Sequence, residues 1–316
     1  MITRIAMALC FCGSLLVLGQ TNSQQKPPAG TTTGGIPGVV AAGTKVELIW
    51  MGFQSADGII GAPDGSLLFA EQVASRVSRI DKDGNVSAYL QDTNGTGALA
   101  IDSKGRIISA ERLKPGVGIL TPSHKVLADN FEGEALKDAN DLVVDKKGGV
   151  YFTEGRRNPR NTAVYYINSS GHIMKVTDDV ERANGIMLDR DEKILYVTNG
   201  PVILAFDVRP DGSVTNLRSF ARTDGGGRAG SDGLAIDSTG RLYVASPTGV
   251  QVFSPQGQHL GTIPTPRPTT SVAFAGPGKK TLYVVGRGAE GPGDQQWARS
   301  IYKISMLAEG FKGRAK

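Results

Sequence analysis

Four polar side chains recur at one place in a repeating unit of this sequence, and their chemistry is that of ligands for a hard cation. They are Asp57, Asn140, Asn184 and Asp232, and each begins an apolar, strand-like run. Two carboxylates and two amide oxygens suit Ca²⁺, which takes about 6 to 8 oxygen ligands and tolerates irregular geometry. Zinc is less favoured because no His or Cys accompanies them, although Zn²⁺, Mn²⁺ or Mg²⁺ could occupy such a site. The pattern predicts one bound divalent cation, provided that the four side chains meet.

The competing interpretation is local, because Asn and Asp at strand starts often cap turns through hydrogen bonds to the backbone. Four such residues at equivalent positions are harder to explain as caps, although Gly97 and Thr270 break the pattern. A second recurring set fits turn capping better, namely Asp141, Asp145, Asp189 and Asp237.

The repeat that carries these residues is typified by 140–154, in which an apolar strand, a turn and a second strand rich in β-branched and aromatic residues follow one another. A turn position follows each repeat start by eight residues, and successive starts are 40, 43, 44, 48 and 38 residues apart. A period of about 40 to 45 residues with several strands is typical of a β-propeller. The starts are Asp57, Gly97, Asn140, Asn184, Asp232 and Thr270, and the turn positions are Gly65, Gly105, Gly148, Glu192, Gly240 and Gly278.

The last repeat contains only three clear strands, at 271–275, 281–285 and 300–304. An isolated strand at 46–50 precedes the first repeat and can supply the fourth. The sequence therefore predicts an all-β, six-bladed β-propeller closed by an N-terminal strand that completes the last blade. Such closure removes exposed sheet edges, which otherwise promote aggregation.

The N-terminal residues predict export. Residues 1–20 have Arg4 followed by an apolar run, as in a signal peptide, and the run is too short for a membrane span. Cys10 and Cys12 lie inside it, so the mature chain would have no disulfide or thiolate ligand. We expect a flexible leader without packing at 21–44, the propeller at 45–306 and a tail at 307–316. The mature protein is expected in the periplasm or secreted, without a stable membrane span, as a monomer or weak dimer.

The overall charge does not indicate a nucleic-acid partner. The net charge is +5 and the isoelectric point is near 9.1, but the basic residues are dispersed and no aromatic residues alternate with them. A nucleic-acid-binding surface would need a basic stripe. We therefore expect no nucleic-acid partner.

Several motifs resemble the senescence marker protein/gluconolactonase/luciferin-regenerating family. They are Phe131-Glu-Gly133, Ala139-Asn-Asp-Leu-Val-Val144, Val150-Tyr-Phe-Thr-Glu154, Ala183-Asn-Gly-Ile186 and Ser231-Asp-Gly-Leu-Ala235. The resemblance implies a six-bladed propeller that holds one divalent cation through a Glu, two Asn and an Asp, and often the hydrolysis of sugar lactones. It assigns the two Asn to Asn140 and Asn184 and the Asp to Asp232, whereas Asp57 stands in the place of the Glu.

The resulting hypothesis is a metal-dependent lactonase acting on a small-molecule lactone, with Asp232 as the catalytic general base. Candidate substrate contacts are Asp138, Glu154, Arg157 and Arg228. The main alternative is a non-catalytic binding propeller with a structural cation, because one fold serves many functions. A lyase similar to strictosidine synthase is less favoured, because no buried catalytic Glu is evident from the sequence. A serine hydrolase is disfavoured, because no Gly-x-Ser-x-Gly motif occurs and the three histidines share no common position.

Overall fold

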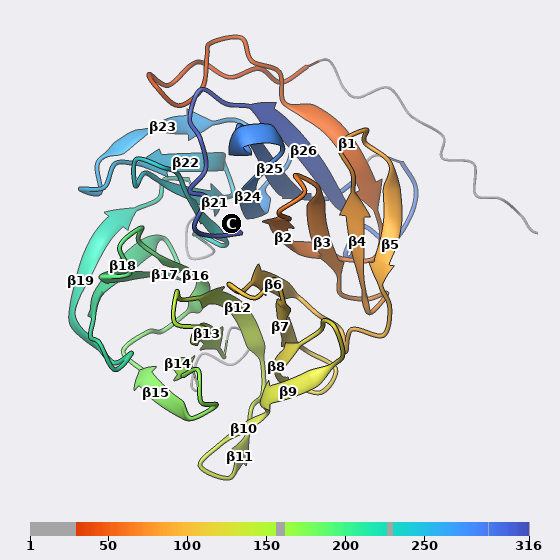
Figure 1. The fold of residues 1–316 in the computed structure, drawn as a ribbon. Coiled ribbons are helices and arrows are strands. Elements are labelled where there is room, and N and C mark those ends of the chain that lie inside the picture. The colour runs from red at the N-terminus through yellow and green to blue at the C-terminus, as the bar shows by residue number, and fades with distance from the viewer. Residues whose placement is uncertain (1–29, 156–161, 226–229, 290, 316) are drawn as a thin grey trace, which may run out of the picture.

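The computed structural model describes residues 30–155, 162–225, 230–289 and 291–315. Six four-stranded antiparallel sheets surround a central axis, which confirms the predicted all-β, six-bladed propeller (Figure 1). A two-stranded hairpin, β10 (Asn130–Phe131) and β11 (Glu134–Ala135), projects from the ring between the second and third blades. None of the described residues forms a helix long and apolar enough to cross a bilayer.

The first five blades follow one plan, in which the chain begins at the innermost strand and works outward. Their strands are β2 (Ala56–Gly61), β3 (Leu67–Glu71), β4 (Arg76–Ile80) and β5 (Val86–Leu90) in blade 1; β6 (Ala98–Ile101), β7 (Ile107–Glu111), β8 (Gly116–Ile119) and β9 (Lys125–Ala128) in blade 2; β12 (Ala139–Val144), β13 (Val150–Glu154), β14 (Ala163–Ile167) and β15 (Ile173–Thr177) in blade 3; β16 (Ala183–Leu188), β17 (Ile194–Asn199), β18 (Val202–Val208) and β19 (Val214–Arg222) in blade 4; and β20 (Leu234–Ile236), β21 (Leu242–Ser246), β22 (Gly249–Phe253) and β23 (His259–Ile263) in blade 5.

Blade 6 joins the two ends of the chain, as the sequence predicts. Its strand order is β1-β26-β25-β24, so the N-terminal strand is outermost and pairs antiparallel with β26. The pairing runs from Glu47 opposite Lys303 to Gly52 opposite Arg299. The four strands are β1 (Glu47–Gly52), β24 (Thr269–Ala275), β25 (Thr281–Arg287) and β26 (Arg299–Ser305), and a short 3-10 helix, η1 (Pro277–Lys279), links β24 to β25.

The core lies between neighbouring blades. Strands β12, β13 and β24 are buried along their whole length, because adjacent blades cover both of their faces. The outer strand β5 is exposed at all but one position, because it has a neighbour on one side only. Full burial of one Phe or Leu side chain stabilises a fold by roughly 1.5–3 kcal/mol, so the apolar inner strands hold the ring together.

The six predicted turn positions all have positive φ, so the repeats share a backbone conformation at this turn as well as a sequence pattern. Five are glycines, which adopt this conformation without strain. The exception is Glu192, which has a φ of 60°. Its carboxylate accepts hydrogen bonds from Arg314 and from the Lys146 amide, which explains why a strained side chain replaces glycine here.

The N-terminal leader differs from the expectation of a segment without packing. From residue 30 onward it lies against blades 5 and 6, where Val39 and Val40 are fully buried and Ile36 is nearly so. The carbonyl of Val39 also accepts backbone hydrogen bonds from Leu307 and Ala308. Three apolar side chains in a Gly-rich segment are enough to dock it. Residues 1–29, including the predicted signal peptide, lie outside the described residues.

The C-terminal tail crosses the axis at one end of the ring, where Figure 1 marks the C-terminus. Its backbone pairs with blade 5 through Ser238 to Glu309, with blade 6 through Gly310 to Lys279, and with blade 1 through Gly61 to Ala315. Gly61 ends the innermost strand of its blade, so the tail lies at the end of the propeller where the innermost strands finish. We call this end the tail mouth.

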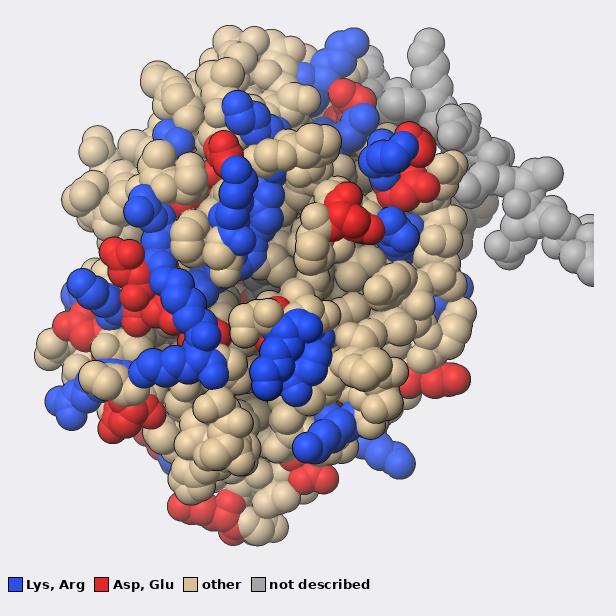
Figure 2. Space-filling model, in the orientation of Figure 1, with Lys and Arg blue, Asp and Glu red and all other residues tan. Residues whose placement is uncertain are grey.

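Arg314 extends the tail to blades 3 and 4. Its side chain is only 4% exposed and donates to the carbonyls of Val144, Leu188 and Asp189 and to the carboxylate of Glu192. The four cationic residues of the tail mouth are Lys146, Lys279, Lys312 and Arg314, which line a cavity of about 500 Å³. Figure 2 shows Lys and Arg side chains around the centre of this face, with Asp and Glu among them.

Candidate metal centre

The six residues that start the repeats line one small cavity on the axis. They sit at or just before the starts of the innermost strands, so this cavity lies at the opposite end of those strands from the tail. We call this end the ligand mouth. The cavity volume is about 20 Å³, and about 10–15 Å³ is enough to hold one water molecule. The space therefore suits a single occupant of the size of a water molecule or a metal ion.

Local irregularities in the innermost strands accompany three of the four candidate ligands, Asp57, Asn140 and Asn184. The pairing of the first two strands shifts register in blades 1, 3, 4 and 6. Each shift falls at the repeat start, between Asp57 and Ile59 in blade 1 and between Ala139 and Leu142 in blade 3. A bulge at this point bends the strand and redirects a side chain that would otherwise face a neighbouring blade.

The glycine that follows some repeat starts is required by close packing between blades. A Cβ atom on Gly185 would lie 2.1 Å from the carbonyl oxygen of Asp232, and one on Gly233 would lie 3.0 Å from that of Thr270. The Asn-Gly and Asp-Gly pairs of the sequence therefore let neighbouring innermost strands approach one another. This approach brings the Asn184 and Asp232 side chains to one cavity.

The two amides hydrogen-bond each other across the boundary of blades 3 and 4. Asn140 Nδ2 donates to Asn184 Oδ1 at 2.6 Å, and Arg112 Nη2 donates to Asn140 Oδ1 at 2.7 Å. The Thr153 hydroxyl holds the backbone by donating to the Asn184 carbonyl at 2.6 Å. A cation that used both amide oxygens would replace the first two hydrogen bonds.

Three carboxylates complete the wall, from Asp57, Asp141 and Asp232. Asp141, which the sequence assigned to turn capping, instead accepts backbone hydrogen bonds from Leu142 and, across the blade boundary, from Ile186. The other members of that set, Asp145, Asp189 and Asp237, do cap their turns as predicted.

The donor set fits a hard cation. No three His, Cys, Asp or Glu side chains cluster as metal ligands within the described ranges, so a cation here would need the amide oxygens as well. Two amide oxygens with the carboxylates of Asp57 and Asp232 make an all-oxygen set of the kind that Ca²⁺ prefers. The four predicted residues therefore line one cavity.

Two arginines at this mouth were not predicted. The guanidinium of Arg112 lies across Gly97, where a Cβ atom would be 2.4 Å from Nε, and Nη1 donates to Gln72 Oε1 at 3.3 Å. Arg287 ends β25 and places Nη2 3.5 Å from Asp232 Oδ2. Neither arginine stands at a repeat start, so the repeat pattern gave no signal for them. Gly97 has no side chain because Arg112 fills the space that a side chain would need.

Two of the four candidate substrate contacts, Asp138 and Glu154, belong to the described residues and lie next to the start of β12. Glu154 is buried and accepts the Lys137 amide at 2.5 Å, so it holds the loop before β12, and neither it nor Asp138 lines the cavity. Burial, and then the Glu154 carboxylate, raise the pKa of Tyr165 to about 12. Arg157 and Arg228 lie outside the described residues.

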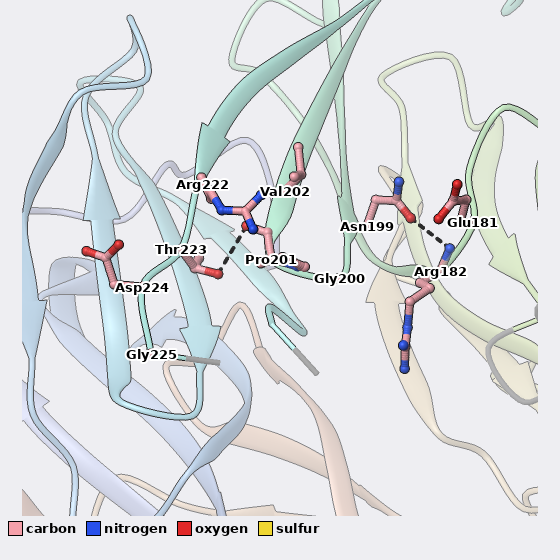
Figure 3. Close-up of a pocket in the computed structure, with 10 residues that line it drawn as sticks. All are labelled: Glu181, Arg182, Asn199, Gly200, Pro201, Val202, Arg222, Thr223, Asp224 and Gly225. Carbon is pink, nitrogen blue, oxygen red and sulfur yellow. Dashed lines mark hydrogen bonds between the residues drawn. The ribbon is translucent and has the colours of Figure 1, made fainter. Parts of the chain in front are cut away.

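A larger cavity of about 810 Å³ lies at the end of blade 4 where its innermost strand begins (Figure 3). Its lining comes from the segment before β16, the turn between β17 and β18, and the end of β19. Asn199 pairs with Ala183, the neighbour of Asn184, and its Oδ1 accepts the Arg182 amide at 2.7 Å. The Ser231 amide, next to Asp232, donates to the Gly200 carbonyl at 2.8 Å. Two lining residues, Asn199 and Gly200, thus pair with chain neighbours of two candidate ligands.

The fold and the axial oxygen cluster define a six-bladed propeller with a candidate cation site. The family model described as "SMP-30/Gluconolactonase/LRE-like region" matches residues 55–287, and the chain belongs to this family. The match contains all four candidate ligands and both arginines.

Relatives and solved structures agree with this assignment. The chain is 27% identical over 262 residues to a gluconolactonase of Zymomonas mobilis, covering 71% of this chain and 74% of that protein. It is 27% identical over 284 residues to lactonase drp35 of Staphylococcus haemolyticus, covering 81% and 85%. Among solved structures, a gluconolactonase from Xanthomonas campestris superimposes with a TM-score of 0.74 at 24% identity, covering 90% and 99%. Regucalcin from Agrobacterium tumefaciens, described as a calcium-binding protein, gives 0.68 at 18% identity, covering 82% and 92%.

Proposed function

We propose that this protein is a lactonase that opens a sugar lactone with the help of one divalent cation, with Ca²⁺ favoured. The observation that carries the proposal is the convergence of Asp57, Asn140, Asn184 and Asp232, from four blades, on one cavity of about 20 Å³. Relatives named gluconolactonase and lactonase, and the calcium-binding neighbour, support the same choice. The cavity of about 810 Å³ at the same end of blade 4 falls within the range of about 300–1,000 Å³ typical of small-ligand pockets.

Each of the four residues has a proposed role at the cation. Asn140 and Asn184 would bind it through their amide oxygens and take no part in proton transfer. Asp57 would bind it in the place where family members have a Glu, with a side chain one methylene shorter. When bound, the cation would polarise the lactone carbonyl and stabilise the negative charge that develops on its oxygen.

Asp232 is the proposed general base. Its carboxylate would take a proton from the attacking water as the water oxygen bonds to the carbonyl carbon. The ring C–O bond then breaks, the ring oxygen leaves with a proton, and the product is a hydroxy acid that ionises to its carboxylate. The side chain of Asp232 is 16% exposed, so water can reach it.

The experiment is an assay of aldonolactone hydrolysis with the untreated protein, after treatment with a chelator, and after addition of Ca²⁺, Mn²⁺ or Zn²⁺. We expect activity to be lost with the chelator and restored by at least one ion, and Asp232→Ala to be inactive under every condition. Asp207→Ala removes an exposed carboxylate of blade 4 and is the matched control. Activity retained in Asp232→Ala would remove this mechanism, and a chelator effect on melting temperature alone would favour the non-catalytic binding propeller.

A further inference from the structure

Two guanidinium groups approach the candidate cation site from either side of blade 1. Arg112, after β7 in blade 2, donates to Asn140 Oδ1 at 2.7 Å, and Arg287, in β25 of blade 6, lies 3.5 Å from Asp232 Oδ2. Both therefore contact residues proposed to bind the cation. A positive side chain next to a bound cation is repelled by it, so this placement calls for an explanation.

The charges of the ligand mouth indicate what would relieve this repulsion. The cavity wall carries three carboxylates, from Asp57, Asp141 and Asp232, and the two arginines contribute two positive charges. A divalent cation would then change the local sum from −1 to +1. A cavity with a net positive charge attracts an anion and binds it more tightly than a neutral analogue of the same shape.

The two arginines differ in how firmly they are held. Arg112 is partly buried and braced by Gln72 and Asn140, so its guanidinium has a fixed position. The Arg287 side chain is 52% exposed, and its 3.5 Å contact with Asp232 is longer than a usual N–H···O hydrogen bond. Arg287 can therefore turn toward a ligand at small cost. Guanidinium groups bind carboxylate and phosphate through two parallel hydrogen bonds, which a neutral hydroxyl cannot match.

We infer that the preferred substrate is a lactone that carries an additional anionic group, a carboxylate or a phosphate, and that Arg287 and Arg112 bind this group. The inference rests on the proposed lactonase function. Hydrolysis leaves the additional group unchanged, because water adds to the ring carbonyl and only the ring ester bond breaks. The two arginines set substrate preference, whereas the residues around the cation carry out the reaction.

The test compares three lactones of similar ring shape: neutral glucono-1,5-lactone, its 6-phosphate and a glucarolactone with a free carboxylate. We expect kcat/KM to be at least about tenfold higher for one of the charged lactones, since a charge-assisted contact is worth about that factor. The charged lactone with the higher kcat/KM shows whether the recognised group is a phosphate or a carboxylate. Equal or higher kcat/KM for the neutral lactone would overturn the inference.

Variants connect the preference to the named side chains. Arg287→Gln is expected to reduce the preference for the charged lactone about tenfold, because kcat/KM should fall more for the charged lactone than for the neutral one. Arg218→Gln is the matched control, because Arg218 is an equally exposed arginine paired with an Asp, on the outer strand of blade 4. Arg112→Gln should act in the same direction, and Arg287→Gln keeps the test decisive if the Arg112 variant fails to fold. An unchanged preference in Arg287→Gln would contradict the inference.

A binding measurement separates this inference from the proposed function. Isothermal titration with the hydroxy acids gluconate, 6-phosphogluconate and glucarate needs no turnover. We expect at least one of the two acids with a second anionic group to bind at least about tenfold more tightly than gluconate, and 0.5 M NaCl to weaken this difference. If no lactone is hydrolysed, the proposed function fails, and the titration alone decides whether the arginines select an anion. Equal binding of all three acids would overturn the inference.

Discussion

The two mouths of the propeller use polar residues in opposite ways. At the tail mouth, each of the four cationic side chains has a partner within the chain: Arg314 binds Glu192, Lys312 binds Glu309, and Lys146 and Lys279 donate to backbone carbonyls. At the ligand mouth, carboxylates, amides and arginines surround a cavity of about 20 Å³ on the axis. One mouth is closed by the chain itself, and the other presents its polar atoms to a common point.

The charged residues look dispersed in the sequence, but the two mouths use them differently. Those of the tail mouth stabilise the fold, whereas those of the ligand mouth are proposed to bind ligands. Partners at the tail mouth come from distant parts of the chain, as between Arg314 and Glu192, and fasten the tail across the ring. We propose that partners at the ligand mouth are exchanged for a cation or an anion. Changes at the two mouths should therefore have separable effects, on stability at one and on activity at the other.

The largest effect is expected from Asn184→Ala at the ligand mouth. The variant removes one proposed ligand oxygen and the hydrogen bond from Asn140. We expect lactonase kcat/KM to fall about 100-fold, by analogy with the loss of contacts around bound metals, while unfolding free energy falls by only about 1 kcal/mol. Asn85→Ala, on an exposed turn, is the control. A full loss of stability together with activity would mean that Asn184 is structural.

Next in size is Arg314→Ala at the tail mouth. The variant removes a buried guanidinium and leaves the Glu192 carboxylate, which is 14% exposed, without its arginine. We expect a loss of about 2 kcal/mol in unfolding free energy, measured by urea denaturation, with kcat/KM unchanged within about twofold. Lys312→Ala, which removes an exposed cation from the same segment, should cost less than about 0.5 kcal/mol. Loss of activity in folded Arg314→Ala would show that the two mouths are coupled.

A smaller effect isolates the strained turn at Glu192. Glycine would relieve the backbone strain at φ 60° but would also remove the partner of Arg314. In the Arg314→Ala background the ion pair is already absent, and the relief of strain is opposed only by the loss of the exposed hydrogen bond from the Lys146 amide. Glu192→Gly should therefore raise unfolding free energy by about 0.5 kcal/mol there and lower it in the native background. The four denaturation curves of this cycle measure the coupling. A change of the same sign in both backgrounds would rule out the proposed exchange of strain for an ion pair.

The smallest effect concerns pH at the tail mouth. Burial lowers the pKa of Lys279 to about 8, from 10.5 in the unfolded chain. Between these values the unfolded chain binds more protons, so this group makes the fold more stable as pH rises through that window. Lys279 is partly exposed, so we expect wild type to gain no more than about 1 kcal/mol relative to Lys279→Met between pH 7.5 and 9.5. Melting curves of both proteins at each pH would test the sign.

Most of the fold could be predicted from the sequence because a similar sequence pattern recurs in each blade. Each repeat carries a start position, an apolar strand and a turn position eight residues after the start, and the structure confirms the turn positions in all six blades. The closing strand followed from counting strands in blade 6. The docking of 30–44 and the path of the tail could not be predicted, because Val39 and Arg314 have partners far away in sequence and no repeat to reveal them.

In the candidate site, the sequence could predict the residues at repeat starts but not the others. Residues at repeat starts, such as Asp57 and Asn140, could be expected to meet because symmetry brings equivalent positions to the axis. Arg112 and Arg287 could not be expected there, because each occurs once and reaches the axis from the end of a second strand. Asp141 looked like a turn residue because Asp often caps turns, and the sequence gives no sign of the hydrogen bond that it accepts from Ile186 in the next blade.

The most direct test of the account is a crystal structure of the protein soaked with Ca²⁺ and, separately, with Mn²⁺, with the ion located by its anomalous scattering. The account predicts one ion per chain on the propeller axis, with oxygen atoms of Asp57, Asn140, Asn184 and Asp232 within about 2.6 Å of it. An ion bound elsewhere, or an axial site that stays without an ion at millimolar concentrations of both metals, would contradict it.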